Sequence, residues 1–406
     1  MTDLRPLPLS GIRVLDFGHI VAGPFCVRLL ADLGADVVKV ETSTRQGRTG
    51  ARRNRPRSGG GTSGRTPHLA QINRNRRSID LNLKTDQGRD VALKLIATAD
   101  VLVENFSSGV MDRLGLGYDA LAKINPRLVY TSMSAFGHTG PRQGWTGMNV
   151  TLQACSGLML ATGEAGDPPI GISNSWNDYI GGLHAAVAIV GALGKRRETG
   201  KGCYLDVSQF ECSVATVGSL LLASAVSGKP PARHGSRSTA IAPQGCYRCA
   251  GADQWCAISV ESDEQWHSLL AALGGPATQL RALDLATAAD RLRHHDAIDS
   301  AINVWTATLS PAEVEQRLKS LGIPAAAMRR GPDLTEVAAW RKLLLPLEGA
   351  GGSDLKVVGL PFSLRGSAPI AATEAPRVGA TGRQALRDWL DLDEQAIAEL
   401  LPETAS

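Results

Sequence analysis

The chain has 406 residues with a formal net charge of +4, and 43% of its residues are apolar. This length predicts a large core and more than one domain. No uninterrupted apolar run approaches the roughly 20 residues that span a bilayer, and the N-terminus lacks a signal-peptide pattern. The sequence therefore predicts a cytoplasmic protein with no membrane partner.

The positive charge is concentrated in one segment, residues 42–79, which holds ten arginines and no acidic residue. The rest of the chain carries 33 basic against 39 acidic residues, which argues against a nucleic-acid-binding protein. The Gly/Ser-rich run at 58–64 is typical of a flexible loop. Such an arginine-rich loop suits a polyphosphate ligand, and a solvated surface loop is the alternative.

The seven cysteines are too sparse and irregular for a disulfide framework, so we expect reduced thiols. Cys246 and Cys249 have C-x-x-C spacing, with Cys256 nearby. No second pair completes a zinc site, so buried structural cysteines are the better interpretation, and no metal is predicted.

The N-terminal half alternates strand and helix patterns. The predicted elements are, in chain order, a strand at 12–17, a helix at 25–33, a strand at 36–41, a helix at 85–99, a strand at 101–104, a helix at 118–124 and a strand at 128–132. This rhythm predicts a doubly wound, Rossmann-like α/β domain, whose ligands gather at the carboxyl ends of the strands. The turn at 18–23 lacks the middle glycine of the dinucleotide fingerprint, which argues against an NAD enzyme.

Further along, the pattern changes. We expect a strand at 204–207, a long apolar helix at 209–225, a linker at 229–239, paired strands at 245–260, a strand near 322–326 and an edge strand at 360–364. We therefore predict a large domain formed by 1–225 and 326–406, with a smaller α+β domain inserted at 226–325.

Asp178 precedes an apolar stretch at 183–193 and is followed closely by Gly181 and Gly182. A carboxylate at a helix start lies beside unpaired N–H groups and the positive end of the helix dipole. Two glycines without side chains would let a carbonyl group approach the backbone. Two interpretations stay open from these residues alone: a nucleophile, or an ordinary Asp N-cap.

Several blocks of sequence resemble the family III CoA-transferases over nearly the whole chain. They occupy residues 14–17, 22–24, 33–41, 75–84, 100–106, 136–141 and 199–202. The resemblance implies that Asp178 is the nucleophile and forms a covalent aspartyl intermediate. It also implies that a CoA thioester is a substrate, that a carboxylic acid is its acceptor, and that two chains form an interlocked dimer.

The resemblance implies contacts with CoA for particular residues of this chain: His19, Ala22, Leu81, Lys84, Asn105, Phe106 and Arg113. Phe106 and Leu81 would sandwich the adenine, and Lys84 and Arg113 would meet phosphates. From residue type alone, each of these seven residues has a purely structural interpretation, as a core residue, a solvated charge or a turn residue. Backbone N–H groups near Gly181 and Gly182 would stabilise oxyanions beside the acyl group.

This sequence departs from the family pattern at positions that affect which carboxylic acid the enzyme would use. Val21 stands where oxalate-using members carry glutamine, and the segment 236–243 lacks their glycine-rich loop. These departures argue against oxalate and favour a larger, partly hydrophobic acid, with succinyl-CoA, a common donor in the family, as a candidate. Two rival functions remain: an α-methylacyl-CoA racemase, and a subunit of a heteromeric transferase, which would pair with a related chain.

One feature argues against the racemase. Such enzymes carry Gly-His-Asp where this chain has Gly147, Met148 and Asn149, and a methionine cannot transfer a proton. The presence of Asp178 argues against a subunit that has lost its nucleophile.

Overall fold

The computed structural model describes residues 4–43, 67–340, 343–349 and 355–401. The chain divides into two compact units. A large unit comprises Met1–Leu158, Gly171–Ala223 and Ala338–Ser406, and a small unit comprises Met159–Ile170 and Ser224–Val337. Each unit is described by itself.

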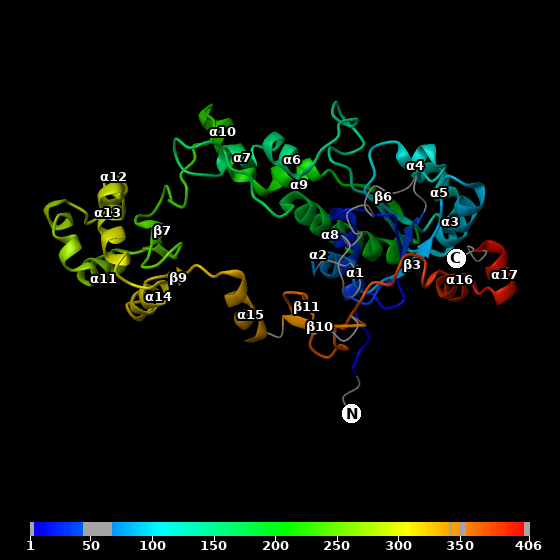
Figure 1. Cartoon of the computed structure of the whole chain (residues 1–406). Helices are drawn as coiled ribbons and strands as arrows, with labels where there is room; N and C mark the ends of the chain where they lie inside the picture. Colours follow the sequence, from blue (N-terminus) through cyan, green and yellow to red (C-terminus); the bar gives the residue numbers. More distant parts are fainter. Residues whose placement is uncertain (1–3, 44–66, 341–342, 350–354, 402–406) are drawn as a thin grey trace. The chain divides into compact units, whose positions relative to one another are not determined.

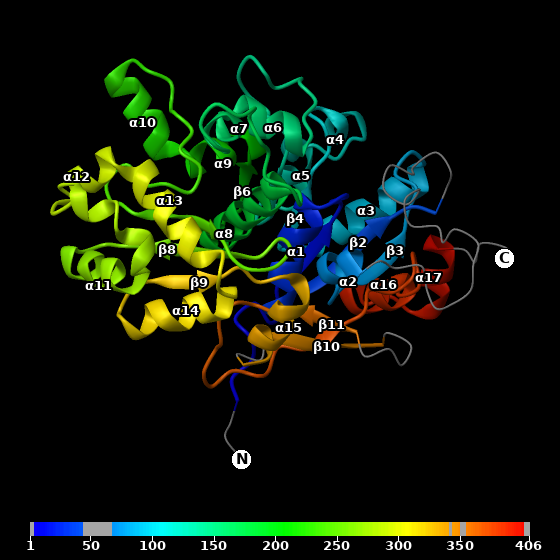
Figure 2. The ribbon, with the colours of Figure 1, turned by 60° about the vertical axis from the view of Figure 1, so that its left-hand side comes forward.

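The large unit is built on a parallel sheet with the strand order β3-β2-β1-β4-β5-β6 (Figures 1 and 2). The strands are β1 (Arg13–Asp16), β2 (Asp36–Glu41), β3 (Arg77–Asp80), β4 (Val101–Glu104), β5 (Val129–Ser132) and β6 (Cys203–Asp206). All neighbouring pairs are parallel. The prediction of a doubly wound sheet is confirmed, and the chain reverses its direction of winding between β1 and β4.

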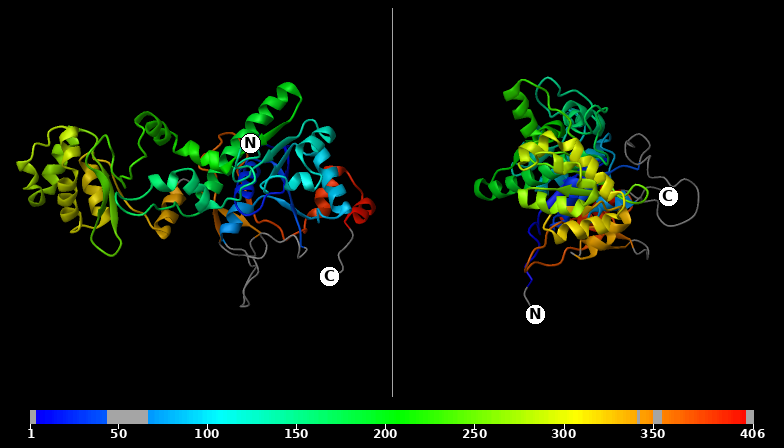
Figure 3. Two further views of the ribbon diagram at one scale, coloured as in Figure 1. Left: turned by 90° about the horizontal axis from the view of Figure 1, so that it is seen from above. Right: turned by 90° about the vertical axis from the view of Figure 1, so that its left-hand side faces the viewer.

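Helices cover both faces of this sheet. They are α1 (Ala22–Asp32), α2 (Pro67–Asn73), α3 (Asp86–Thr98), α4 (Val110–Arg113), α5 (Tyr118–Ile124), α6 (Asn149–Cys155), α8 (Trp176–Thr199), α9 (Gln209–Thr216), α16 (Gly382–Leu390) and α17 (Glu394–Leu400). Successive strand residues serve opposite faces: Leu15 packs in the cluster of α3, α5, α16 and α17, whereas Val14 packs with α1 and α8. Figure 3 shows α16 and α17 beside α3.

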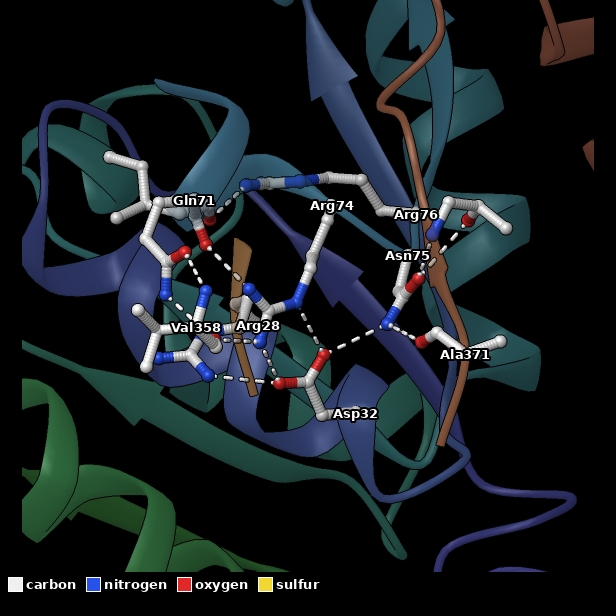
Figure 4. Close-up of polar contacts among 10 residues, drawn as sticks. Arg28, Asp32, Gln71, Arg74, Asn75, Arg76, Val358 and Ala371 are labelled. Atoms are coloured by element: carbon white, nitrogen blue, oxygen red, sulfur yellow. Dashed lines mark hydrogen bonds and ion pairs between the residues drawn. The ribbon is translucent and has the colours of Figure 1, made fainter. Parts of the chain in front are cut away.

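Hydrogen bonds connect the C-terminal part of the chain to the N-terminal part. A smaller sheet of β10 (Leu344–Glu348), β11 (Lys356–Val358) and β12 (Ala372–Thr373) belongs to the large unit. The backbone oxygen of Val358 accepts from Arg74 at 2.8 Å, and that of Ala371 accepts from Asn75 at 2.9 Å. Figure 4 shows both donors on the fully buried Asp32, which also pairs with Arg28 at 2.9 Å.

The small unit has an antiparallel sheet, β7-β8-β9, and its own core. Its elements are β7 (Gln244–Arg248), β8 (Trp255–Ser259), α11 (Asp263–Leu273), two 3₁₀ turns at Gly275–Ala277 and Leu280–Ala282, α12 (Ala288–Arg293), α13 (His295–Thr306), α14 (Pro311–Ser320) and β9 (Ala325–Ala327). Three further helices cross the division between the units: α7 (Leu158–Ala161), α10 (Gly218–Ser227) and α15 (Gly331–Trp340).

Two predicted elements are wrong. The apolar helix expected at 209–225 is two helices, α9 and α10, which meet at an angle of 69° next to Gly218. The edge strand expected at 360–364 does not form, since Pro361 cannot donate to a ladder, and β11 at 356–358 takes that role. No single helix among the described residues could cross a membrane by length and composition, although the bent pair α9 and α10 passes that test together.

Candidate functional site

The turn from β1 into α1 is fixed by buried charges. Asp16 accepts from the backbone N–H of Gly18 at 2.7 Å and pairs with Lys39 at 3.3 Å. Lys39 also donates to the carbonyl oxygen of Gly18. This turn lies at the carboxyl end of β1, beside the point where the winding of the sheet reverses, which is where doubly wound domains bind ligands.

Asn105 holds this turn from the neighbouring strand. Its Oδ1 accepts from the backbone N–H of His19 at 2.8 Å, and its Nδ2 donates to the His19 carbonyl at 2.9 Å. The rings of His19 and Phe106 lie 4.8 Å apart. The fold therefore brings together three residues that the sequence assigned to CoA. Burial and the nearby Lys39 lower the pKa of His19 to about 4, so its imidazole is neutral at pH 7.

The other predicted CoA residues lie in different settings. Leu81 is buried in the core cluster against which Phe106 packs, so it offers little surface to a ring. Lys84 is exposed just before α3, and Arg113 is exposed at the last residue of α4. Neither cation forms an ion pair within the described residues, which leaves both charges open to an anion.

The arginine-rich segment splits into two groups. Seven of its ten arginines lie outside the described residues. The other three bind acidic side chains of the protein: Arg74 pairs with Asp32, Arg76 with Asp16, and Arg77 with Asp36 and Asp388. These three are therefore structural, and the expectation that they meet a polyphosphate is corrected by their ion pairs.

Asp178 is the third residue of α8 and not its N-cap. The cap position is taken by Ser175, whose backbone is left-handed with φ of 55° and whose side chain makes no capping bond to the helix backbone. Asn174 before it also has a positive φ, 68°. The N-cap interpretation of Asp178 is therefore wrong, because the helix begins two residues earlier than its carboxylate.

The pKa of Asp178 departs from the ordinary value of an aspartate side chain. Burial raises the pKa of this carboxyl to about 6, and a hydrogen bond with Ser175 opposes the shift. A carboxyl with its ordinary pKa would be ionised across the whole neutral range. Here the ionised form still dominates at pH 7, but it is lost as the pH falls through 6.

Two polar atoms beside Asp178 are buried without a partner among the described residues: the indole Nε1 of Trp176 and the side-chain Oδ1 of Asn177. The backbone N–H of Asn177 donates to Asn149 at 3.3 Å. Unpaired buried polar atoms are costly, and they occur where a ligand completes the bonding. Sequence reasoning missed Trp176, Asn177 and Asn149 as candidate site residues. Asn149 has no local signal, because its contact with Asn177 depends on the tertiary pairing of α6 with α8.

Gly181 and Gly182 have a packing role. A Cβ on Gly182 would lie 2.8 Å from a ring carbon of Phe25 and 2.9 Å from the Ala22 carbonyl, so a side chain would push α8 away from α1. A Cβ on Gly181 would meet Gln209 at 3.1 Å. This contact places the predicted CoA residue Ala22 against the helix of Asp178. An additional role in holding an oxyanion stays a prediction.

Val21 is buried at the N-cap of α1, where its carbonyl accepts from Phe25 at 2.8 Å. Its neighbour Ile20 is half exposed and has a φ of 64°. Positive φ is rare for a β-branched residue, so the bonds that hold His19 on one side and α1 on the other impose strain on Ile20.

The cysteines show no catalytic or metal-binding arrangement. All seven lie among the described residues, and each is a free thiol. Cys249 and Cys256 belong to the core of the small unit. Within the described residues, no group of three histidine, cysteine or acidic side chains could hold a metal ion.

Comparison with known proteins gives a consistent result. Residues 9–381 match the sequence model of CoA-transferase family III. The chain is 34% identical to acetyl-CoA:oxalate CoA-transferase of Acetobacter aceti, covering 88% of this chain and 92% of that one. It is 31% identical to succinyl-CoA:mesaconate CoA-transferase of Haloarcula hispanica, covering 91% and 93%.

The solved structures agree. A CAIB/BAIF family protein from Brucella suis superposes with a TM-score of 0.83 at 29% identity, covering 95% of this chain and all of that one. The relatives are named for different donors and acids, so the likeness does not fix the acid for this chain.

Proposed function

The chain belongs to CoA-transferase family III and is a CoA-transferase, and from this premise we propose that it works through a covalent intermediate on Asp178. One observation carries the proposal. Asp178 lies in the first turn of a 24-residue helix, where the positive end of the helix dipole favours negative charge. That helix contacts Ala22 at the turn expected to hold CoA.

The reaction begins when the Asp178 carboxylate attacks the thioester carbonyl of the donor. The CoA thiolate leaves, and a mixed anhydride joins Asp178 to the acyl group. The thiolate then attacks the aspartyl carbonyl, which gives an aspartyl-CoA thioester and releases the donor acid. No general base is required, since the carboxylate is the dominant form at pH 7 despite its raised pKa of about 6.

The second half repeats these steps with the acceptor. The acceptor carboxylate attacks the aspartyl-CoA thioester and expels the thiolate, which then attacks the acceptor carbonyl of the new anhydride. Acyl-CoA forms, and Asp178 is regenerated as a carboxylate. Each addition produces an oxyanion, for which we propose backbone N–H groups near Gly181 and Gly182, a contact whose loss typically costs about 2.7–4 kcal/mol.

We propose that CoA lies along the β1 and β4 turns. His19, Ala22, Asn105 and Phe106 would contact it directly, with Leu81 beside the adenine and Lys84 and Arg113 near the phosphates. The exposure of both cations supports this placement. Changing either to Ala should raise KM for acyl-CoA, with a larger effect at low salt, because exposed charges are screened. Unchanged CoA affinity in both variants would place CoA elsewhere.

For the substrates, we propose an aliphatic carboxylic acid as acceptor and succinyl-CoA as donor. The buried, apolar Val21 supports an acid with an apolar surface. The acceptor is best found by mass spectrometry with a panel of acids and both succinyl-CoA and acetyl-CoA.

We further propose that the protein is cytoplasmic and that residues at about 226–325 form an inserted small domain. We also propose that two copies of the chain form an interlocked homodimer, with a heterodimer of related subunits as the alternative. Apolar side chains that α8 leaves exposed, Leu183, Val187 and Val190, support a covering partner. A dimer of this kind should not dissociate on dilution without unfolding. A folded, active monomer at nanomolar concentration would contradict it.

Trapping tests the mechanism. Incubation with acyl-CoA followed by hydroxylamine should mark the peptide that contains Asp178, and Asp178→Ala should fold but give no mark. A racemase would instead exchange the α-proton of the substrate with solvent deuterium. Full transfer activity in Asp178→Ala, or proton exchange without CoA transfer, would overturn the proposal.

A further inference from the structure

A polar pocket of about 280 Å³ lies beside β4, β5 and β6 in the large unit. Its lining includes Glu104, Tyr118, Tyr130, His138 and Tyr204. Glu104 is only 2% exposed, although it ends the strand that leads directly into Asn105 and Phe106. A buried carboxyl at this position needs a physical reason, because an unpaired one would be strongly destabilising.

Both carboxyl oxygens of Glu104 accept hydrogen bonds. Oε2 accepts from the backbone N–H of Phe106 at 2.8 Å. Oε1 accepts from the hydroxyl of Ser132, which lies directly opposite in the register of β4 and β5. Two accepted bonds of this kind match an ionised carboxylate, which has no proton to donate.

The Ser132 hydroxyl has a second neighbour, the Nε2 of His138, at 2.6 Å. Because Ser132 has one proton and gives it to Glu104, this contact requires His138 to donate from Nε2. The result is a chain of donors from His138 through Ser132 to Glu104. The backbone N–H of His138 is itself held by Asp206 at 2.9 Å.

The direction of donation along these hydrogen bonds can reverse without any movement of the heavy atoms. When Glu104 takes up a proton, its hydroxyl can donate to Ser132, and Ser132 can donate to an unprotonated Nε2 of His138. A proton that binds Nδ1 of His138 thus allows the Nε2 proton to pass through Ser132 to Glu104. The buried carboxyl is therefore connected to the pocket by hydrogen bonds.

Glu104 is also connected to the turn expected to hold CoA. Its bond to the Phe106 N–H fixes the peptide that joins Asn105 to Phe106. Asn105 in turn holds both backbone groups of His19. A charged acceptor makes a hydrogen bond roughly twice as strong as a neutral one, so the charge on Glu104 affects how firmly this turn is held.

We propose that Glu104 is a positioning residue for CoA, whose ionised form fixes the Asn105–Phe106 turn and whose charge is set from the pocket through Ser132 and His138. This inference rests on the proposed function, since it assigns CoA to that turn.

The surroundings of Glu104 place its titration near neutrality. Burial raises its pKa to about 7, the bonds from Ser132 and Phe106 oppose the shift, and the charges of Asp112 and Asp206 add to it. Other titratable groups around the pocket are Tyr118, Asp119, Tyr130, His138 and Tyr204. Glu104 is therefore ionised above about pH 7 and protonated below it, and CoA affinity should fall on acidification.

Glu104→Gln tests this inference, because the amide keeps the shape and fixes the neutral state. The measurement is the dissociation constant of CoA by calorimetry at pH 6 and pH 8. We expect the variant to bind CoA about tenfold more weakly than wild type at pH 8 and within about twofold of it at pH 6. The ratio between the two proteins removes the titration of the CoA phosphate and of Asp178, which both share.

Glu315→Gln is the matched control, since Glu315 also accepts from a backbone N–H, that of Ala327 at 3.0 Å, in the small unit. It should bind CoA as wild type does at both pH values. A second variant, Ser132→Ala, removes a bond that lowers the pKa of Glu104. It should therefore move the midpoint of the pH dependence upward.

The outcomes are distinct. Equal CoA affinity of wild type and Glu104→Gln at pH 8 overturns the inference and leaves the proposed function standing. An unmoved midpoint in Ser132→Ala also overturns it, even where Glu104→Gln fails to fold. Absence of CoA binding by wild type overturns the proposed function and this inference together.

Discussion

The turn at the ends of β1 and β4 differs from the start of α8 in how its polar groups are satisfied. At the turn, Asn105 binds both backbone groups of His19, and Glu104 binds the N–H of Phe106. These bonds come from Glu104, the last residue of β4, and from Asn105, which follows it. The turn is thus preorganised, which lowers the ordering cost of binding.

The start of α8 is less complete. Asn174 and Ser175 have left-handed backbones, no side chain caps the helix, and polar atoms of Trp176 and Asn177 lie buried without partners among the described residues. Such features persist at sites where a ligand completes the bonding. The comparison suggests a division of roles: the turn holds the unreactive part of the substrate, and the helix start holds the part that changes during the reaction.

The largest expected effect separates the two regions by chemistry. Asp178→Asn should lower the transfer rate by at least about 10³-fold, because an amide is a poor nucleophile. It should also raise the free energy of unfolding at pH 8 by roughly 1–3 kcal/mol, since the folded state disfavours the carboxylate whose pKa is raised to about 6. Rate assays and denaturant unfolding measure both.

The matched change is Asp296→Asn, in the first turn of α13. It should leave the rate unchanged, because that carboxylate is exposed and paired with Arg237. A loss of rate in this variant, or a loss of stability in Asp178→Asn, would contradict the role assigned to Asp178.

The pH dependence of the transfer rate should follow the titration of Asp178. In the proposed mechanism Asp178 attacks as a carboxylate, so the transfer rate at saturating acyl-CoA should be constant above about pH 7 and fall toward tenfold per pH unit below 6. Saturation removes the effect of Glu104 on binding. Single-turnover rates between pH 5 and pH 8 measure this, and a flat profile down to pH 5 would show that burial does not raise the pKa of Asp178.

A smaller effect concerns the turn. Asn105→Ala should release His19 and raise KM for acyl-CoA by about tenfold, with a smaller change in kcat, because binding and not chemistry is affected. Asn125→Ala is the control, since the side chain of Asn125 also binds two backbone groups, the carbonyls of Ile96 and Ala99. It should cost about 1–3 kcal/mol of stability and leave KM unchanged. Equal KM values in the two variants would contradict a role of this turn in binding acyl-CoA.

The smallest effect concerns strain. Ile20→Gly should stabilise the protein by about 1 kcal/mol, since glycine adopts the left-handed backbone that costs a β-branched residue. Asp391→Gly makes the same change at the C-cap of α16, where φ is 53°, and should gain less because Asp tolerates this conformation better. Denaturant unfolding of both variants measures the change in the free energy of unfolding. A lower value for Ile20→Gly than for wild type would show that Ile20 is not strained.

The sequence alone determined much of the large unit. Buried strands such as 101–104 and the helix that follows Asp178 have local signals, because apolar periodicity and turn residues act over a few positions. The same holds for the family resemblance, which implies CoA contacts for His19, Asn105 and Phe106 from sequence alone.

Only the tertiary structure decided the rest, because it depends on which distant groups meet. Arg76 reads as part of a loop, but Asp16 holds it in the core. Asp178 reads as an ordinary carboxylate, but burial raises its pKa to about 6. Glu104 reads as the end of a strand, and only the pairing of β4 with β5 sets it opposite Ser132. Charge states and hydrogen-bond partners are long-range properties, and no local pattern of residues specifies them.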